Sequence, residues 1–425
     1  MFNFFFTMKD FKTLFSLIIV ISYYFEYGEG QRILSIKDFI IDTNHTIIDY
    51  SQAFQEAWKG LCEDETPNGS ALVIRKNETY TLQPSTFRGP CVSSNIHIQI
   101  DGKLEGPRKP IYWKNKENRS WLGFKDVEGL VINGSGVLNP HGEAWWKSVS
   151  LSKRPTTISF ASCMDIIYNG LHHINSPRNH ISIYGCTNAT LSNLDISAPE
   201  DSPNTDGINI CLSHRIQILD SSIQTGDDCV AITGGRGGSS DINITGVACG
   251  PGHGISIGSL GKDNERDDIV ENVNVRSCSF TGTQNGARIK TWNGGRGLAK
   301  NILYENITLI DAGYPIIINQ HYFDNNKKHY FDKSFLKESG VKVDNITFRY
   351  FEGTSSSEIP IKLDCEETEN CHNITMEHIN ITSPTPGKNL TAYCKFADVS
   401  SSFVNIDVDC NTNEDHQPHI LSPLP

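Results

Sequence analysis

The chain has 425 residues, enough for one large domain or two of ordinary size, and no stretch in its middle has the composition of a linker. It carries 49 acidic and 37 basic residues, and the net charge of -12 argues against nucleic acid as a partner, because a polyanion needs a basic face. This charge does not exclude an anionic substrate that is held in a locally basic groove.

Residues 1–30 have the features of a secretory signal peptide. Two lysines precede an apolar run from Leu14 to Tyr24, and small residues follow from Gly28 onward. The run is shorter than the roughly 20 residues that span a bilayer, so an uncleaved membrane anchor is the weaker alternative. We therefore expect cleavage near residues 28–31 and a single secreted domain over residues 31–425, with no membrane association after cleavage.

The cysteines and glycosylation sequons agree with an oxidising, extracellular compartment. The chain holds 12 cysteines, none of them in the expected signal peptide, and about a dozen Asn-x-Ser/Thr sequons typical of a secreted glycoprotein. Three cysteines spaced about one repeat apart are as consistent with a buried ladder of free thiols as with disulfides. These three are Cys163, Cys186 and Cys211, and the candidate disulfides are the close pairs Cys62–Cys91, Cys229–Cys249, Cys365–Cys371 and Cys394–Cys410.

Residues 31–107 are expected to form an amino-terminal cap together with the first short strands. Within Tyr50–Leu61 the apolar residues recur at helical spacing, as Ala53, Phe54, Ala57, Trp58 and Leu61. A helix that covers the open end of a stacked sheet hides the exposed edge of the first strand. We therefore predict a capping helix in this segment.

From about residue 95 onward, short alternating strands rich in Val and Ile repeat along the chain, and helical periodicity is nearly absent. Equivalent positions lie mostly about 24 to 31 residues apart, with a longer gap that indicates an inserted loop within residues 321–340. The pattern predicts an all-β fold, a right-handed parallel β-helix of about ten coils, with residues 395–425 as a carboxy-terminal tail. The irregular period and the lack of hairpin dipeptides disfavour a β-sandwich or propeller. The repeat positions are Leu130, Ile166, Leu191, Ile216, Ile242, Val273, Ile302, Ile346 and Ile374.

Four polar phrases recur at about the period of the repeat. They are Ser-Pro-Asn-Thr-Asp-Gly at 202–207, Thr-Gly-Asp-Asp-Cys at 225–229, Gly-His-Gly at 252–254 and Arg-Ile-Lys at 288–290. If each repeat is one coil, residues one repeat apart stack on one face with a spacing of about 4.8 Å. Stacking brings three carboxylates, one imidazole and two cations together: Asp206, Asp227, Asp228, His253, Arg288 and Lys290.

Such a cluster suits general acid–base chemistry. Crowded carboxylates repel, so at least one of them holds its proton to higher pH, as a general acid must. A solvated turn is the ordinary interpretation of Gly-Asp-Asp alone, but three further polar phrases at the same period make that interpretation weak. We expect His253 to hydrogen-bond a carboxylate and tune its pKa. Arg288 and Lys290 alternate along a strand and point the same way, which predicts a clamp for a substrate carboxylate.

The four phrases resemble, in order, the signature motifs of the polygalacturonases, glycoside hydrolases of family 28 that degrade pectin, and the plant members most closely. The resemblance is strong over residues 154–371. It implies hydrolysis of the α-1,4 bond between galacturonate residues, with inversion and without a metal or organic cofactor.

The resemblance also implies roles for individual residues. Asp227 is the expected general acid, while Asp206 and Asp228 position and deprotonate a water molecule. Tyr322 matches the family's substrate-contacting tyrosine, and Asn204, placed with the substrate-binding residues, is expected to hold the turn that presents Asp206. The expected partner is a pectic polysaccharide in the cell wall, bound by a monomer.

Two other functions stay open at this point. A calcium-dependent pectate lyase could use the same fold, and a catalytically silent pectin-binding wall protein could keep the groove without the reaction. The stereochemistry is open as well, because rung stacking would place Asp206 about 5 Å from Asp227 and Asp228, a separation typical of retaining glycosidases. We favour inversion, because Asp206 and Asp228 can share a water between them.

Overall fold

The computed structural model describes residues 31–40, 49–66, 68–114, 119–263, 266–322, 340–367 and 371–410. The expected signal peptide lies outside these ranges, as do most of the expected inserted loop and about half of the expected tail. Within the described ranges, no helix is long and apolar enough to cross a membrane.

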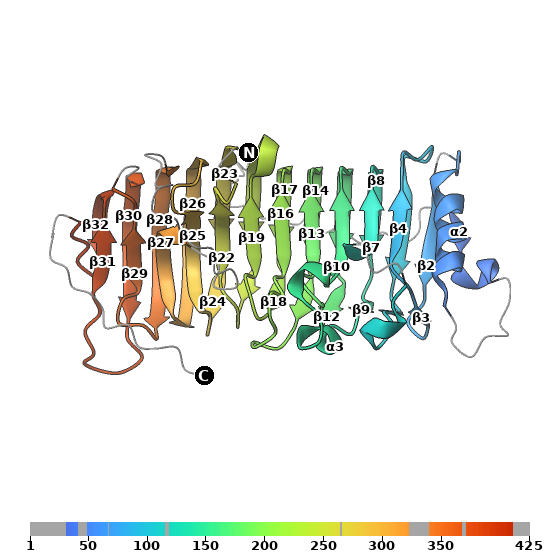
Figure 1. Ribbon diagram of the computed structural model, residues 1–425, viewed down its shortest axis with the longest axis horizontal. Coiled ribbons are helices and arrows are strands. Elements are labelled where there is room, and N and C mark those ends of the chain that lie inside the picture. The colour runs from blue at the N-terminus through green and yellow to red at the C-terminus, as the bar shows by residue number, and fades with distance from the viewer. Residues whose placement is uncertain are drawn as a thin grey trace, which may run out of the picture.

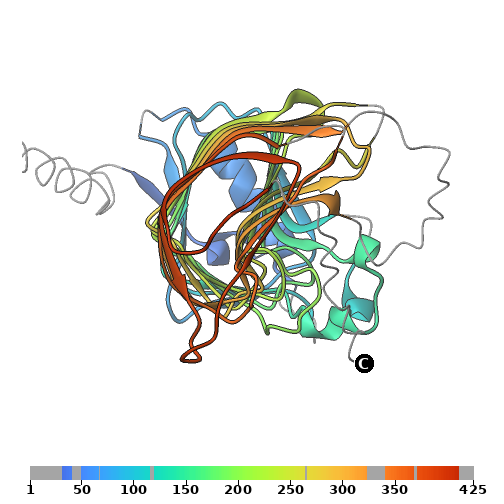
Figure 2. The same cartoon turned by 90° about the vertical axis from the view of Figure 1, so that its left-hand side faces the viewer.

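The described chain forms a parallel β-helix whose coils are stacked along one long axis (Figure 1). Seen along that axis, the coils overlie one another around a common interior (Figure 2). An 11-stranded sheet forms one face and a 21-stranded sheet forms the rest of the wall, and strands one coil apart pair in parallel. Because each coil contributes one strand to the 11-stranded sheet, the described chain forms eleven coils, close to the expected number of about ten.

The 11-stranded sheet consists of β4 (Ser85–Arg88), β7 (Ser120–Lys125), β10 (Thr156–Ala161), β13 (Ile181–Tyr184), β16 (Ile208–Cys211), β19 (Val230–Thr233), β22 (Ile255–Leu260), β25 (Asn285–Trp292), β27 (Tyr314–Tyr322), β29 (Ile361–Asp364) and β31 (Ala392–Lys395).

The 21-stranded sheet consists of β1 (Arg32–Leu34), β2 (Ser70–Ile74), β3 (Thr79–Thr81), β5 (Ile96–Ile100), β6 (Lys103–Glu105), β8 (Glu128–Asn133), β9 (Val137–Asn139), β11 (Met164–Asn169), β12 (His172–Ile174), β14 (Thr187–Ser192), β15 (Asp195–Ser197), β17 (His214–Leu219), β18 (Ser222–Gln224), β20 (Ser239–Thr245), β21 (Ala248–Cys249), β23 (Asp268–Arg276), β24 (Ser279–Thr281), β26 (Gly297–Ala312), β28 (Val341–Ser355), β30 (Cys371–Thr382) and β32 (Ala397–Val404). The helical elements are α2 (Ser51–Cys62), α3 (Glu143–Trp146) and the short 3-10 turns η1 (Ile36–Phe39), η2 (Pro110–Tyr112), η3 (Leu151–Lys153) and η4 (Gly235–Gly237).

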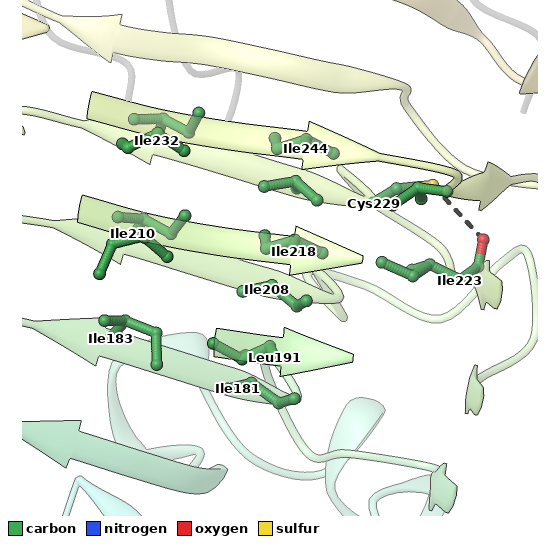
Figure 3. Close-up of a cluster of buried hydrophobic side chains, with 14 of the residues drawn as sticks. Ile181, Ile183, Leu191, Ile208, Ile210, Ile218, Ile223, Cys229, Ile232 and Ile244 are labelled. Atoms are coloured by element: carbon green, nitrogen blue, oxygen red, sulfur yellow. Dashed lines mark hydrogen bonds between the residues drawn. The ribbon is translucent and has the colours of Figure 1, made fainter. Parts of the chain in front are cut away.

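Stacked aliphatic side chains fill the interior, as Figure 3 shows for the central coils. Ile183, Ile210 and Ile232 occupy one column on successive strands, and all three are fully buried. Burying one such side chain stabilises the fold by about 1.5 to 3 kcal/mol, and β-branched residues pack well on a pleated surface. The alternation of apolar and polar residues in each strand thus fixes which residues enter the core.

The main predicted column is confirmed at all but one position. Strand pairing aligns Ile166 with Ala189, and Ala189 with Ile216. Leu191 lies two residues further on, stacked between Tyr168 and Ile218. The prediction was wrong here because both Ala189 and Leu191 point inward, and a shift of two residues leaves the alternating pattern unchanged.

The predicted capping helix is confirmed as α2, which covers the first coil at the amino-terminal end of the stack (Figure 1). Its apolar face is buried, and the ring of Trp58 lies 5.6 Å from the rings of both Phe87 and Phe124. The indole nitrogen of Trp58 donates to the carbonyl of Arg88 at 3.0 Å. The helix therefore closes the core and satisfies its own buried polar group.

All four expected disulfides are formed. Cys163, Cys186 and Cys211 are free, as the ladder alternative expected, but only the first two lie buried in one column. Cys211 pairs in register with Tyr184 and is partly exposed. The next position of the thiol column is Ser213 instead, whose hydroxyl accepts a hydrogen bond from the backbone nitrogen of Cys186 at 3.0 Å.

Candidate active site

The four polar phrases lie on successive coils, as predicted. Three of them are the turns that precede β16, β19 and β22, and the fourth is part of β25. Register along the sheet places Asp206, Asp228 and His253 in one column, because Ile208, Val230 and Ile255 pair in sequence. The strands therefore bring together residues that are far apart in the chain.

Close packing of the turns explains two glycines of the phrases. A side chain at Gly226 would place its Cβ 2.0 Å from the carbonyl oxygen of Ser202, one coil away. Gly254 has a φ of +90°, and a Cβ there would lie 2.3 Å from the carbonyl oxygen of Gly286. The backbone nitrogen of Gly226 also donates to the hydroxyl of Thr205 at 3.0 Å. Each turn is thus held in place by its neighbours.

Asp228 lies at the centre of a buried charge network, and its side chain is 1% exposed. The ammonium of Lys290 contacts one carboxylate oxygen at 2.5 Å, and Arg288 Nη1 lies 3.4 Å from the other. The hydroxyl of Ser256 donates to that second oxygen at 2.7 Å. Two cations and one hydroxyl therefore compensate the desolvation of this carboxylate.

Asp227 faces the surface more than Asp228 does, with 18% of its side chain exposed. Its carboxylate pairs with the ring nitrogen Nδ1 of His253 at 2.9 Å and accepts from the amide of Asn204 at 3.1 Å. Burial alone would raise the pKa of Asp227, but the hydrogen bond and charge of His253, the charge of Lys290 and the backbone hydrogen bond of Asp228 together outweigh burial and lower it. The expectation that His253 tunes a carboxylate therefore agrees with this contact.

Among the carboxyl groups of the cluster, Asp206 is the one with a raised pKa. Burial is the largest cause, and the charges of Asp227 and Asp228 add to it, so the pKa of Asp206 lies well above its usual value. The crowding argument is thus supported, but the raised pKa belongs to Asp206, whereas the family resemblance gives the acid role to Asp227. The difference arises because Asp227 has an imidazole partner and Asp206 adjoins two carboxylates.

Asn204 and the two cations contact protein groups that the sequence did not indicate. Ser202 and Thr205 hold the turn, with their hydroxyls 2.6 Å apart, while the Asn204 amide is used on Asp227. Arg288 and Lys290 point the same way as predicted, and both bind Asp228. Arg288 uses one terminal nitrogen for that contact, so its other N–H groups can bind a second anion.

Tyr322 joins the same cluster. Its ring lies 5.6 Å from the guanidinium of Arg288 and 5.5 Å from the ammonium of Lys290. Trp292 packs edge-on against the Tyr322 ring at 5.8 Å and is only partly buried, so it supports this ring rather than filling the core. The structure therefore brings together every residue that the sequence placed in the site.

Two supporting residues were missed by the sequence argument. Ser256 stacks in register on Arg288, and the alternation of β22 would have shown that it faces outward. Arg154 is buried behind the first turn and donates to the carbonyl oxygens of Pro203, Val149 and Trp146. No sequence pattern identifies Arg154, because its partners are backbone carbonyl oxygens, which any residue type supplies.

Two hollows border the cluster. The first forms a groove toward the amino-terminal coils, with a volume of about 510 Å³, and lies over β7, β10, β13, β16 and β19. The second has a volume of about 380 Å³ and lies over turns, with His253 in its lining together with Glu200, Gly226 and Ser356. The turn that carries Asp227 and Asp228 contributes Gly226 to the second hollow and leads into β19, which borders the first. These two carboxylates therefore lie beside both hollows.

The cluster does not suit a resident calcium ion. Ligand atoms of Asp227, Asp228 and His253 lie within 4.8 Å of one another, which is close enough to bind a metal. Both oxygens of Asp228 already contact Lys290 and Arg288, however, and His253 offers nitrogen where Ca²⁺ prefers oxygen. These donors fit proton transfer better than calcium binding.

Comparisons with known proteins agree with this geometry. The family model of the glycosyl hydrolases family 28 matches residues 62–403. A probable polygalacturonase of Arabidopsis thaliana is 44% identical over 346 residues, covering 81% of this chain and 73% of the relative. Polygalacturonase-2 of Solanum lycopersicum is 39% identical over 377 residues, covering 87% and 77% of the two chains.

Solved structures show the same fold at lower identity. An exopolygalacturonase from Thermotoga maritima has a TM-score of 0.69 at 19% identity, covering 92% of this chain and 95% of its own. A polygalacturonase from Erwinia carotovora has a TM-score of 0.68 at 21% identity, covering 89% and 99%. The chain therefore belongs to the glycosyl hydrolases of family 28, the polygalacturonase family that its four motifs resemble.

Proposed function

We propose that this pectin-degrading glycoside hydrolase cleaves the α-1,4 bonds of polygalacturonate by single-step hydrolysis with inversion at the anomeric carbon. The observation that carries the proposal is the different pairing of two adjacent carboxylates: Asp227 binds an imidazole at the groove surface, and Asp228 binds two cations beneath it. One carboxyl group thus has a proton source beside it, and the other has its negative charge compensated.

The Asp227–His253 pair supplies the acid proton. This hydrogen-bonded pair has two forms that differ in the position of one proton. In one form the imidazole holds the proton and Asp227 is a carboxylate, and in the other Asp227 is a carboxylic acid and the imidazole is neutral. A bound sugar ring covers the pair and removes water, which disfavours the charged form and moves the proton toward Asp227. The low pKa of Asp227 in the open groove is therefore compatible with an acid role once substrate is bound.

Asp206 and Asp228 act on the water. They are neighbours in one column, in the turns that precede the paired strands β16 and β19, so a water between them can contact both. The two carboxyl groups together hold one proton, so one of them is ionised. The ionised group accepts a proton from the attacking water. The raised pKa of Asp206 supports such sharing. Arg288 and Tyr322 border the position of the sugar whose bond is cleaved.

One experiment separates this function from its two rivals. Polygalacturonate is incubated with the protein in EDTA or in calcium, while reducing ends and the ultraviolet absorbance of unsaturated uronides are followed. Hydrolysis predicts reducing ends in both buffers with no such absorbance. Calcium-dependent absorbance would indicate the lyase, and binding without new reducing ends would indicate the silent wall protein.

We further propose that the protein is exported and acts as a monomer in the cell wall. The polar and apolar pattern of residues 1–30, the four disulfides and the sequons support export. Sequencing the amino terminus of protein recovered from the medium tests this, with a start near residues 28–31 expected. A mature chain that begins at Met1 would contradict the signal peptide.

A further inference from the structure

The groove on the amino-terminal side of the cluster has a floor that leads directly to the catalytic carboxylates. Its outward positions on successive strands are paired in register, and their side chains are small or polar. The column runs from β10 to β25 as Ser159, Ser182, Asn209, Ala231, Ser256 and Arg288. Such a floor offers hydroxyl and amide groups to sugar rings along its length and admits several of them side by side.

Two arginines line this part of the groove. Arg178 lies in the turn before β13 and is partly buried, and Arg119 lies next to the first residue of β7 and is exposed. Among the described residues, neither guanidinium has an ion-pair partner or a side-chain hydrogen bond. A partly buried arginine without a counter-charge loses hydration and gains nothing in return, so Arg178 in particular is suited to an anion that enters the groove.

The spacing of these arginines follows the coil. Pairing of Ser120 with Thr156, and of Ile158 with Ile181, places Arg119 and Arg178 in one column, two coils apart. The same column reaches Asp227 after two further coils. Two coils correspond to about 10 Å, so the cations stand roughly 10 and 20 Å from the acid along the groove.

We propose that Arg178 and Arg119 bind free carboxylates of uronate units remote from the cleaved bond, and that the enzyme requires unesterified carboxylates on this side. The inference rests on the proposed function. With a net charge of -12, the protein as a whole repels a polyanion, so local guanidinium groups decide where a polyuronate chain can lie. Each guanidinium can bind a carboxylate in a bidentate geometry, which a methyl ester cannot accept.

The hollow beside His253 differs in charge. The described residues that line it include the acidic Glu200 and Asp311, and no lysine or arginine, so free carboxylates are disfavoured there. The floor column itself continues past Arg288 to Ile317 and Lys362. The ammonium of Lys362 lies 3.5 Å from the carboxylate of Asp364, so this cation, unlike Arg178, already has an anionic partner.

The test compares chain lengths. KM and kcat are measured for tri- and hexagalacturonate with the wild type, Arg178→Gln, Arg119→Gln and the double variant. Arg215→Gln serves as the control, because Arg215 is exposed on β17 of the other sheet. We expect the double variant to raise KM for the hexamer about tenfold, with the trimer KM and both kcat values within twofold of the wild type.

Two further measurements separate charge from structure. Arg178→Lys should recover part of the hexamer KM, and methyl-esterified hexamer should bind the wild type and the double variant equally. An unchanged hexamer KM in the double variant, or an equal rise for trimer and hexamer, would overturn the inference. A wild type that hydrolyses neither oligomer would instead refute the proposed function.

Discussion

Asp227 and Asp228 are adjacent in the chain, yet their carboxylates contact different sets of partners. Asp227 pairs with His253 at 2.9 Å, and Asp228 is bound by Lys290 at 2.5 Å. The backbone nitrogen of Asp228 also donates to the carboxylate of Asp227 at 2.9 Å, which fixes the relative orientation of the two groups. One two-residue turn thus presents one carboxylate to the groove and the other to buried cations.

Replacing the proposed acid should abolish turnover and spare binding. Asp227→Asn keeps the size of the side chain and the contact with His253 but cannot deliver a proton. We expect kcat to fall by roughly a thousandfold or more, with KM within a few-fold of the wild type. Glu200→Gln, in the nearby hollow, is the matched control with expected near-normal kcat. An Asp227→Asn enzyme that keeps a tenth of its activity would refute the acid assignment.

Removing the imidazole should move the alkaline limb of the pH–rate profile to lower pH. In the proposed mechanism the Asp227–His253 pair holds the proton that is delivered, and in His253→Ala the carboxyl group of Asp227 must hold that proton alone. A lone carboxyl group loses its proton at lower pH than the pair does, so the alkaline limb of kcat/KM should shift downward. The maximal rate should fall, because Asp227 loses the contact that orients it. An alkaline limb at unchanged or higher pH would contradict the role of the pair as the proton source.

Lys290 should be needed for stability as well as for activity. Its side chain is 9% exposed and pairs with an aspartate side chain that is 1% exposed, so Lys290→Met leaves a buried charge without its closest partner. We expect a loss of about 3 kcal/mol in the free energy of unfolding, measured by denaturant titration. In the double variant Asp228→Asn/Lys290→Met, much of that loss should be recovered. A single variant as stable as the wild type would show that Arg288 and Ser256 suffice for Asp228.

Asp206 should destabilise the fold at neutral pH. Its pKa is raised in the folded state, so the folded protein binds more protons than the unfolded chain at pH values above the unfolded pKa of about 3.9. The stability contribution of this group is therefore intact below that pH and is lost as pH rises through the raised folded pKa. Asp206→Asn removes this loss, and its Tm near pH 7 should exceed that of the wild type by about 2 °C. At pH 3.5 the two Tm values should agree, and an Asn variant less stable at neutral pH would contradict the raised pKa.

The sequence grouped the residues of the candidate site correctly because they recur with the coil. Asp206, Asp228 and His253 could be placed together from their spacing alone. In a parallel β-helix, residues that are one repeat apart in the sequence lie in one column in space. The same logic failed between Ala189 and Leu191, where a shift of two residues preserves the pattern. It also could not show that Asn204 binds Asp227, because a turn residue at a positive φ of 59° directs its side chain by local geometry and not by period.

Partners of the charged groups were harder to predict for a physical reason. Arg288 and Lys290 were expected to bind only a substrate carboxylate. The buried negative charge of Asp228, however, needs cations beside it in the folded protein, and these two residues supply them. The raised pKa likewise belongs to Asp206, because it depends first on burial and then on the distances to Asp227 and Asp228, and spacing along the chain sets neither.

The most direct test of the water mechanism is the anomer formed first. An α-linked oligogalacturonate is hydrolysed in the NMR tube, and the new reducing end is followed by proton NMR before mutarotation equilibrates it. A water held between Asp206 and Asp228 attacks from the face opposite Asp227, so the β-anomer should appear first. An α-anomer appearing first would mean retention through a covalent intermediate, and it would contradict both the shared water and the roles assigned to Asp206 and Asp228.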